Sequence, residues 1–174
     1  MEELKGPPPN ELRTSINEDV LRARIENLKL EQNLGLGIIG GAVGGLLGAV
    51  AWAAVTYLTE YQIGWLALGV GFLVGLGVRF LGKGIDRVFG IVGGVIALVS
   101  VALGNFLTAL GYVAKAYQVS FMEVLQNFDY SMTFDLMKFT FTGMDLIFYA
   151  LAVYAGYRYS FRQITQEQLL EGNL

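Results

Sequence analysis

The sequence predicts an all-α, polytopic membrane protein with four transmembrane helices, glycine-rich packing faces and a cytoplasmic N-terminal helix. The chain of 174 residues is 54% hydrophobic and only 16% charged, with a mean hydropathy of +0.51. A soluble domain normally carries about 25% charged residues. Four long apolar segments follow a polar N-terminal region, and the first of them contains a glycine at every fourth position from Gly37. Length suits one compact membrane domain with a short soluble extension.

The polar N-terminal region has two predicted parts. Residues 1–14 include three consecutive prolines and are predicted to be a disordered tail. Residues 15–33 are predicted to form a polar, cytoplasmic helix, because Ser15 and Glu18 fit a capping box and opposite charges recur four residues apart. This helix either runs as a solvated extension into the first membrane span or binds a partner or a second copy through its apolar edge.

The apolar segments predict a transmembrane domain over residues 34–162, followed by a cytoplasmic tail over 163–174. The first segment is long enough to cross a hydrocarbon core of about 30 Å at about 1.5 Å per residue. Its glycines would weaken a helix in water, but unpaired backbone groups are so costly in lipid that the helix forms. The four predicted spans are 34–58, 64–80, 88–113 and 141–159.

Small residues recur every fourth position in three of the spans and predict close helix packing. Packing within the chain and self-association between subunits use the same kind of surface. The first span has more glycines than a single neighbour needs, so we expect it to contact two neighbours, one of which can belong to another subunit. The predicted packing positions are Gly37, Gly40, Gly41, Gly44, Gly45, Gly48, Gly71, Gly75, Gly90 and Gly94.

The long connection over residues 114–140 is predicted to be an outer cap made of short helices on the membrane surface. The alternative prediction for this segment is a re-entrant element that lines a cavity. The two remaining turns are short, so the first two spans should form a tight antiparallel hairpin.

The distribution of basic residues predicts the orientation. Ten of the twelve Lys and Arg residues precede the first span, lie in the turn between the second and third, or follow the fourth. Both termini are therefore expected in the cytoplasm. In the basic turn, Arg79, Lys83 and Arg87 are predicted to contact anionic lipid head groups. The glycines around Lys83 lack the spacing of a phosphate-binding loop, which argues against nucleotide binding.

The composition also excludes several kinds of chemistry. The chain has no Cys and no His, which removes thiolate nucleophiles, disulfides, the usual general base and the commonest zinc ligands. A net charge of -3 argues for no particular partner. We therefore predict no catalytic residues, no cofactor, no metal site and no nucleic-acid partner.

Asp145 is the most informative ionisable residue, because it is expected about one turn inside the outer end of the fourth span. A carboxylate at that depth is costly and usually faces the bundle or water. It either reaches the interface, or pairs with Lys138 or Lys115, or belongs to a site for a proton, a cation or a lipid head group. The polar residues expected at similar depth, which together could form an outward pocket, are Asp145, Asn105, Thr108, Thr56 and Thr142.

Several stretches of the chain resemble a group of uncharacterised bacterial four-span membrane proteins. The likeness extends over about residues 35–162, and its pattern is W-x-A-x-G-x-G-x-x-V-G from Trp65, then G-K-G-I-D from Gly82, then F-G at Phe89. It implies multi-pass insertion in the bacterial cytoplasmic (inner) membrane and supplies no catalytic residues. Some members of the group carry a zinc-ribbon-like module, which this chain lacks because it has no Cys.

Together these features favour a non-enzymatic membrane scaffold or accessory subunit that assembles through glycine-mediated helix contacts. Its expected partners are the lipid bilayer and either further copies of the chain or a larger membrane complex. The alternative is a homo-oligomeric channel or transporter-like protein that uses the polar residues around Asp145. A membrane enzyme acting on lipids is disfavoured by the lack of His and Cys.

Overall fold

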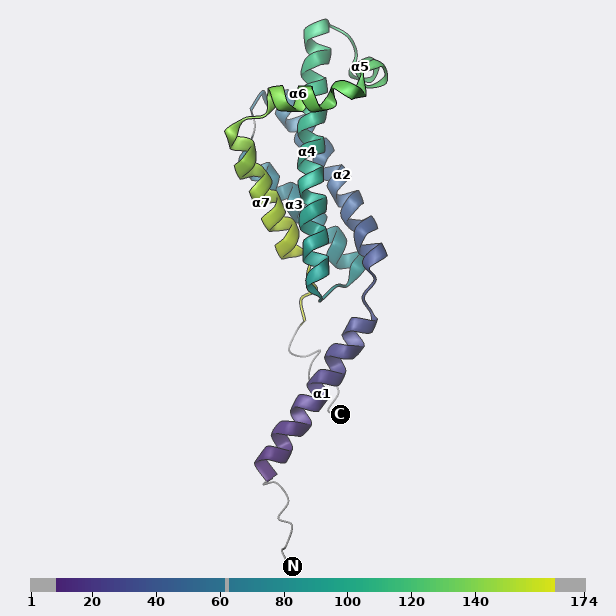
Figure 1. The fold of residues 1–174 in the computed structure, drawn as a ribbon, viewed down its shortest axis with the longest axis vertical. Helices are drawn as coiled ribbons and strands as arrows, with labels where there is room; N and C mark the ends of the chain where they lie inside the picture. Colours follow the sequence, from purple (N-terminus) through teal and green to yellow (C-terminus); the bar gives the residue numbers. More distant parts are fainter. Residues whose placement is uncertain (1–8, 62, 165–174) are drawn as a thin grey trace, which may run out of the picture. The chain divides into compact units, whose positions relative to one another are not determined.

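The computed structural model describes residues 9–61 and 63–164, and in them every regular element is a helix (Figure 1). Contacts divide the chain into two units, residues 33–162 and residues 1–32 with 163–174. The described helices are α1 (Pro9–Leu30), α2 (Leu34–Thr59), α3 (Gly64–Gly82), α4 (Arg87–Tyr117), α5 (Phe121–Asn127), the 3₁₀ helix η1 (Tyr130–Met132), α6 (Thr133–Thr140) and α7 (Gly143–Tyr159).

Helix α1 is longer toward the N-terminus than the sequence suggested. It begins at Pro9 rather than Ser15 and ends at Leu30 rather than residue 33, so residues 9–14 are helical and not part of a disordered tail. Proline is well tolerated in the first turn of a helix, where its missing N–H has no intrahelical partner. Asn33 instead caps α2, because its side chain accepts a 2.9 Å hydrogen bond from the Leu36 amide. The rest of the predicted tails, 1–8 and 165–174, lies outside the described residues.

Three to four helices of the described chain can cross a membrane. Helices α2, α3 and α4 are long and apolar enough on their own. Helix α7 has 17 residues, which reach about 25 Å and fall short of a hydrocarbon core of about 30 Å. It qualifies only together with the segment Tyr130–Thr140, from which it is bent by 105°. The prediction of an all-helical chain with several helices able to span a membrane is therefore confirmed, with three to four such helices.

Helices α2, α3, α4 and α7 run side by side as a bundle, and α6 runs across one end of it (Figure 1). We call this end the α6 end. All four helices contribute buried residues to the bundle core, among them Trp52, Val74, Val101 and Ala152, none more than 1% exposed. A smaller cluster around Leu110 and Val124 packs α5 against α4. The predicted outer cap thus consists of three short helices at the α6 end.

Helices α2 and α3 approach each other so closely that backbone meets backbone. A Cβ placed on Gly40 would lie 2.2 Å from the Gly77 carbonyl oxygen, and a Cβ on Gly77 would lie 2.1 Å from the Gly40 oxygen. A Cβ on Gly44 would lie 2.4 Å from the oxygen of Leu73. No side chain larger than hydrogen fits at these positions without moving a helix.

Gly41 and Gly45 of α2 face α4 as well as α3. A Cβ on Gly41 would lie 2.7 Å from Val78 Cγ2 and 2.9 Å from Ile96 Cδ1, and one on Gly45 would lie 2.2 Å from Ser100 Oγ. Helix α2 therefore has two closely packed neighbours, and both belong to the same chain.

Helix α7 is also held through glycines. A Cβ on Gly71 would lie 2.3 Å from the Ala152 oxygen, and a Cβ on Gly156 would lie 2.6 Å from the Gly93 oxygen. Gly75 and Gly90 face Tyr159 and the ring of Phe161. At Gly94 the nearest atom would be 3.4 Å away, which is ordinary contact. Three glycines outside the predicted packing positions are in tighter contact than Gly94. They are Gly77, Gly93 and Gly156.

Replacing Gly40 by alanine should destabilise the bundle, because the new methyl group would overlap the Gly77 carbonyl oxygen. We expect a loss of about 1–3 kcal/mol, typical of overpacking in a tight core. Thermal unfolding in mild detergent, followed by circular dichroism, measures it. The matched control is Gly69→Ala on α3, where an added Cβ meets nothing within 4 Å. The control should be as stable as the wild type, and two equally stable variants would contradict the packing.

Candidate functional site

The candidate site lies near the α6 end of the bundle and begins with Asp145 in the first turn of α7. Asp145 is only 1% exposed. Its Oδ2 accepts hydrogen bonds from the Thr142 amide at 2.6 Å and from the Thr142 hydroxyl at 2.9 Å. A carboxylate at the N-terminus of a helix also interacts favourably with the helix dipole. Asp145 therefore fixes the start of α7.

Asn105 joins three helices through its side-chain amide. Its Nδ2 donates to Asp145 Oδ1 at 3.1 Å and to the Tyr149 hydroxyl at 3.2 Å, both on α7. Its Oδ1 accepts a 2.8 Å hydrogen bond from the indole N–H of Trp52 on α2. Since Asn105 itself lies on α4, one side chain connects α2, α4 and α7. Hydrogen bonds of this kind hold helices together where water is excluded.

The two other predicted site residues are threonines outside this network. The Thr108 hydroxyl donates to the Gly104 carbonyl of its own helix at 2.9 Å. The Thr56 hydroxyl is buried and has no hydrogen-bond partner, while its backbone carbonyl accepts from the Tyr112 hydroxyl at 3.3 Å. The predicted set is thus divided: Asp145, Asn105 and Thr142 are connected directly, and Thr56 and Thr108 lie beside them.

A cavity of about 260 Å³ adjoins the network between α4, α6 and α7. Asn105 and Thr108 line it, but Asp145, Thr142 and Thr56 do not. Its remaining lining residues are Ala109, Tyr112, Met137, Phe139, Thr140, Phe141 and Tyr149. Polar groups of α4 and α7 therefore line the cavity together with residues of α6. The Asp145 carboxylate does not line it but is hydrogen-bonded to Asn105, which does.

Sequence reasoning missed Trp52 and did not include Tyr149 or Tyr112 in the site. Tyr149 follows Asp145 by four residues, and helical spacing predicts it on the same face of α7, although it was not assigned to the site. Nothing in the sequence distinguishes Trp52 from an ordinary buried aromatic residue, because its role depends on which residue of α4 lies opposite.

Lys115 pairs with Glu60 at the end of α2 and not with Asp145, which corrects one of the two pairings considered for that carboxylate. Both side chains are largely exposed, 57% for Lys115 and 60% for Glu60. The hydrogen bond from Lys115, together with its charge, holds the pKa of Glu60 below its usual value. The pair joins the α6 ends of α2 and α4 at the surface.

The basic residues Arg79, Lys83 and Arg87 lie where α3 ends and α4 begins. Lys83 has a φ of 49° and closes α3, with its amide donating to the Arg79 carbonyl at 3.0 Å. The side chains of Lys83 and Arg87 are exposed and that of Arg79 is half-buried. Their contact with lipid head groups stays a prediction. In residues 9–61 and 63–164, no three acidic side chains gather into a group that could hold a metal ion.

The chain matches no protein-family model, no curated protein and no solved structure. The likeness to bacterial four-span membrane proteins therefore rests on the motifs alone.

Changing Asp145 to asparagine should destabilise the junction of α4 and α7. Both carboxylate oxygens accept hydrogen bonds, and an amide offers only one acceptor, so one donor would face another. An unsatisfied buried group of this kind costs about 1–3 kcal/mol. Adding Asn105→Asp supplies the missing acceptor on the opposite side. We expect the double variant to regain part of the lost thermal stability, and a double variant less stable than both single variants would contradict the network.

Proposed function

We propose that the chain is a non-enzymatic scaffold or accessory subunit in the bacterial cytoplasmic membrane, with both termini in the cytoplasm. It works together with further copies of itself or with a larger membrane complex. The observation that carries this proposal is the network around Asn105, whose hydrogen bonds connect α2, α4 and α7. Its polar groups bind one another across helices, an arrangement that suits a rigid unit.

The glycine contacts support the same proposal in a way that differs from the sequence expectation. The glycines of α2 are occupied by α3 and α4 of the same chain, so they build the subunit. Assembly would then use the opposite face of α2. Ile39, Val43 and Leu47 follow one another at i, i+4 and i+8 there, and are 56%, 57% and 62% exposed. This ridge can face lipid or pack against a helix of a partner.

Orientation and location in this proposal rest on charge and on the resemblance. The basic turn containing Arg79, Lys83 and Arg87 carries three of the ten basic residues assigned to the cytoplasmic side. Such residues are retained on the cytoplasmic side of inner-membrane proteins. The turn lies at the end of the bundle opposite the α6 end, so a cytoplasmic turn would put α5 and α6 at the outer surface.

The scaffold proposal is tested by the mass of the assembly in mild detergent. We expect light scattering of the purified protein to give a protein mass above that of one 19.0 kDa chain, from added copies or from a partner in fixed ratio. Leu47→Ser should shift the distribution toward single chains without changing the thermal stability of the bundle. Leu73→Ser, at a 40% exposed position on α3, is the matched control. A wild-type protein that is always a single chain would contradict the proposal.

A channel or transporter is the second candidate, favoured by the cavity of about 260 Å³ that adjoins the Asp145 network. Its lining by Asn105, Thr108, Tyr112 and Tyr149 offers oxygen and amide groups to a cation or a proton. In this reading the chain forms a homo-oligomer, and α6 and Phe141 control access to the cavity.

Flux measurements in liposomes separate the two candidates. The scaffold proposal predicts that wild-type protein carries no more cation or proton flux than protein-free liposomes. Transport requires flux in the wild type that disappears in a folded Asp145→Asn variant, because that change removes the charge. Flux in the wild type that survives in the variant would exclude a role for this carboxylate and would also contradict a purely structural protein.

A further inference from the structure

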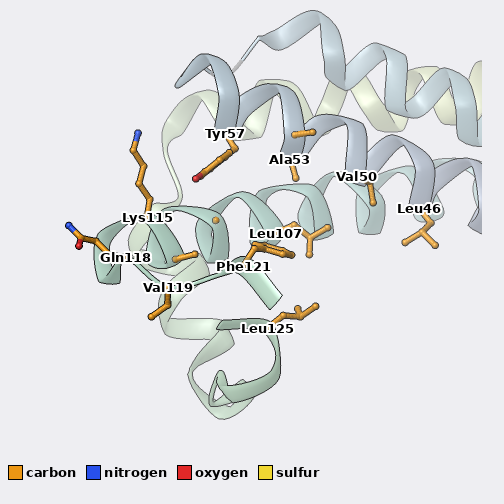
Figure 2. Close-up of a pocket in the computed structure, with 13 residues that line it drawn as sticks. Leu46, Val50, Ala53, Tyr57, Leu107, Lys115, Gln118, Val119, Phe121 and Leu125 are labelled. Atoms are coloured by element: carbon orange, nitrogen blue, oxygen red, sulfur yellow. The ribbon is translucent and has the colours of Figure 1, made fainter. Parts of the chain in front are cut away.

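A second hollow of the bundle, larger than the cavity beside Asn105, lies between α2, α4 and α5 (Figure 2). This groove has a volume of about 660 Å³, which is within the range of about 300–1,000 Å³ typical of small-molecule sites. Its walls are mostly apolar: Leu46 and Val50 come from α2, Leu107 from α4, and Phe121 and Leu125 from α5. Two of the helices that form it, α2 and α4, are long and apolar enough to cross a membrane, so a groove along their sides would be open to lipid.

The polar residues of the groove gather at one end. Figure 2 shows Lys115 and Gln118 at the end near Tyr57, while Leu46 lies at the other end. Lys115 forms the ion pair with Glu60, whose side chain stands at the end of α2. A groove with an apolar body and a charged, exposed mouth matches an amphipathic molecule better than a wholly apolar one.

Gln118, which lines the groove, and Glu60, which pairs with the groove residue Lys115, occupy unusual backbone positions. Glu60 and Gln118 have φ values of 59° and 55° and close α2 and α4, and they are two of the three non-glycine residues with positive φ in the described part of the chain. Glycine is the usual residue at such a position. In a chain with 23 glycines, both positions instead carry a long polar side chain: Gln118 lines the groove, and Glu60 pairs with Lys115.

The length of the groove matches one leaflet of a bilayer. Leu46 and Tyr57 are eleven residues apart on α2, a distance of about 16 Å along the helix. Half of a typical hydrocarbon core is about 15 Å. An acyl chain that starts at the mouth would therefore extend along the groove to about the middle of the bilayer.

We propose that this groove binds a zwitterionic phospholipid, with one acyl chain between α2, α4 and α5 and the head group at the Glu60–Lys115 pair. Lys115 and Gln118 can donate hydrogen bonds to the phosphate, and the Glu60 carboxylate can accept hydrogen bonds from the ammonium group. The pairing of one cation with one anion at the mouth complements a head group that carries both charges. This proposal goes beyond the scaffold function and depends only on the membrane location.

Binding of defined lipids to the purified full chain tests the proposal, with native mass spectrometry of the protein titrated with phosphatidylethanolamine or phosphatidylglycerol. We expect one phosphatidylethanolamine per chain to bind more tightly than phosphatidylglycerol. Ala53→Phe, which fills the groove, should weaken phosphatidylethanolamine at least about tenfold, equivalent to about 1.4 kcal/mol. The matched control is Ala51→Phe, because Ala51 is exposed on the same helix and does not line the groove.

Charge reversal at the mouth gives a second test that does not depend on filling the groove. Glu60→Lys should shift the preference toward phosphatidylglycerol by about tenfold, because it replaces the acceptor for the ammonium group with a second cation. Glu60 is exposed, so this variant should fold like the wild type. Equal binding of both lipids by the wild type, or an unchanged preference in Glu60→Lys, would overturn the head-group assignment. Equal binding by Ala53→Phe and Ala51→Phe would overturn the groove itself.

Discussion

The contact between the backbones of Gly40 and Gly77 is the constraint on which the rest of the bundle depends. With no Cβ on either residue, α2 and α3 come close enough for each carbonyl to meet the other helix. Lipid chains are as apolar as the helices, so burial provides little drive for association and close packing must supply it. On the same helix, Gly41 and Gly45 lie against α4 as well.

This packing explains where the polar residues lie. Because α2 and α4 are held so closely, the Trp52 indole reaches Asn105 at 2.8 Å, and the same amide then reaches Asp145 on α7. The network connects α7, a 17-residue helix that is short for a membrane span, to two long ones. Toward the α6 end the hollow between α2 and α4 becomes the groove whose mouth carries Lys115.

The helical class and the apolar segments were predictable from the sequence. Polar residues at Asn33 and in the turn after Gly82 end the apolar segments, and a membrane span ends where its apolar segment ends. The sequence could not predict which glycines touch. Gly77 lies in no obvious stripe, yet its carbonyl meets Gly40, because contact depends on which helices are neighbours. The 105° bend between α6 and α7 lies at the predicted boundary between the outer cap, 114–140, and the fourth span, 141–159. Of the candidate site, Asp145 and Asn105 were chosen from polarity and depth alone, whereas Trp52 became identifiable only once α2 lay opposite α4.

An engineered disulfide tests whether the glycine face of α2 packs inside its own chain. A Cβ on Gly48 would lie 3.3 Å from the Val70 Cβ on α3, close to the separation of about 3.5–4.5 Å found in disulfides. The chain has no native Cys, so a Gly48→Cys, Val70→Cys variant oxidised in membranes should form a disulfide within one chain. Mixed chains carrying one change each should form none, and a disulfide between two chains would show that this face of α2 packs against another copy.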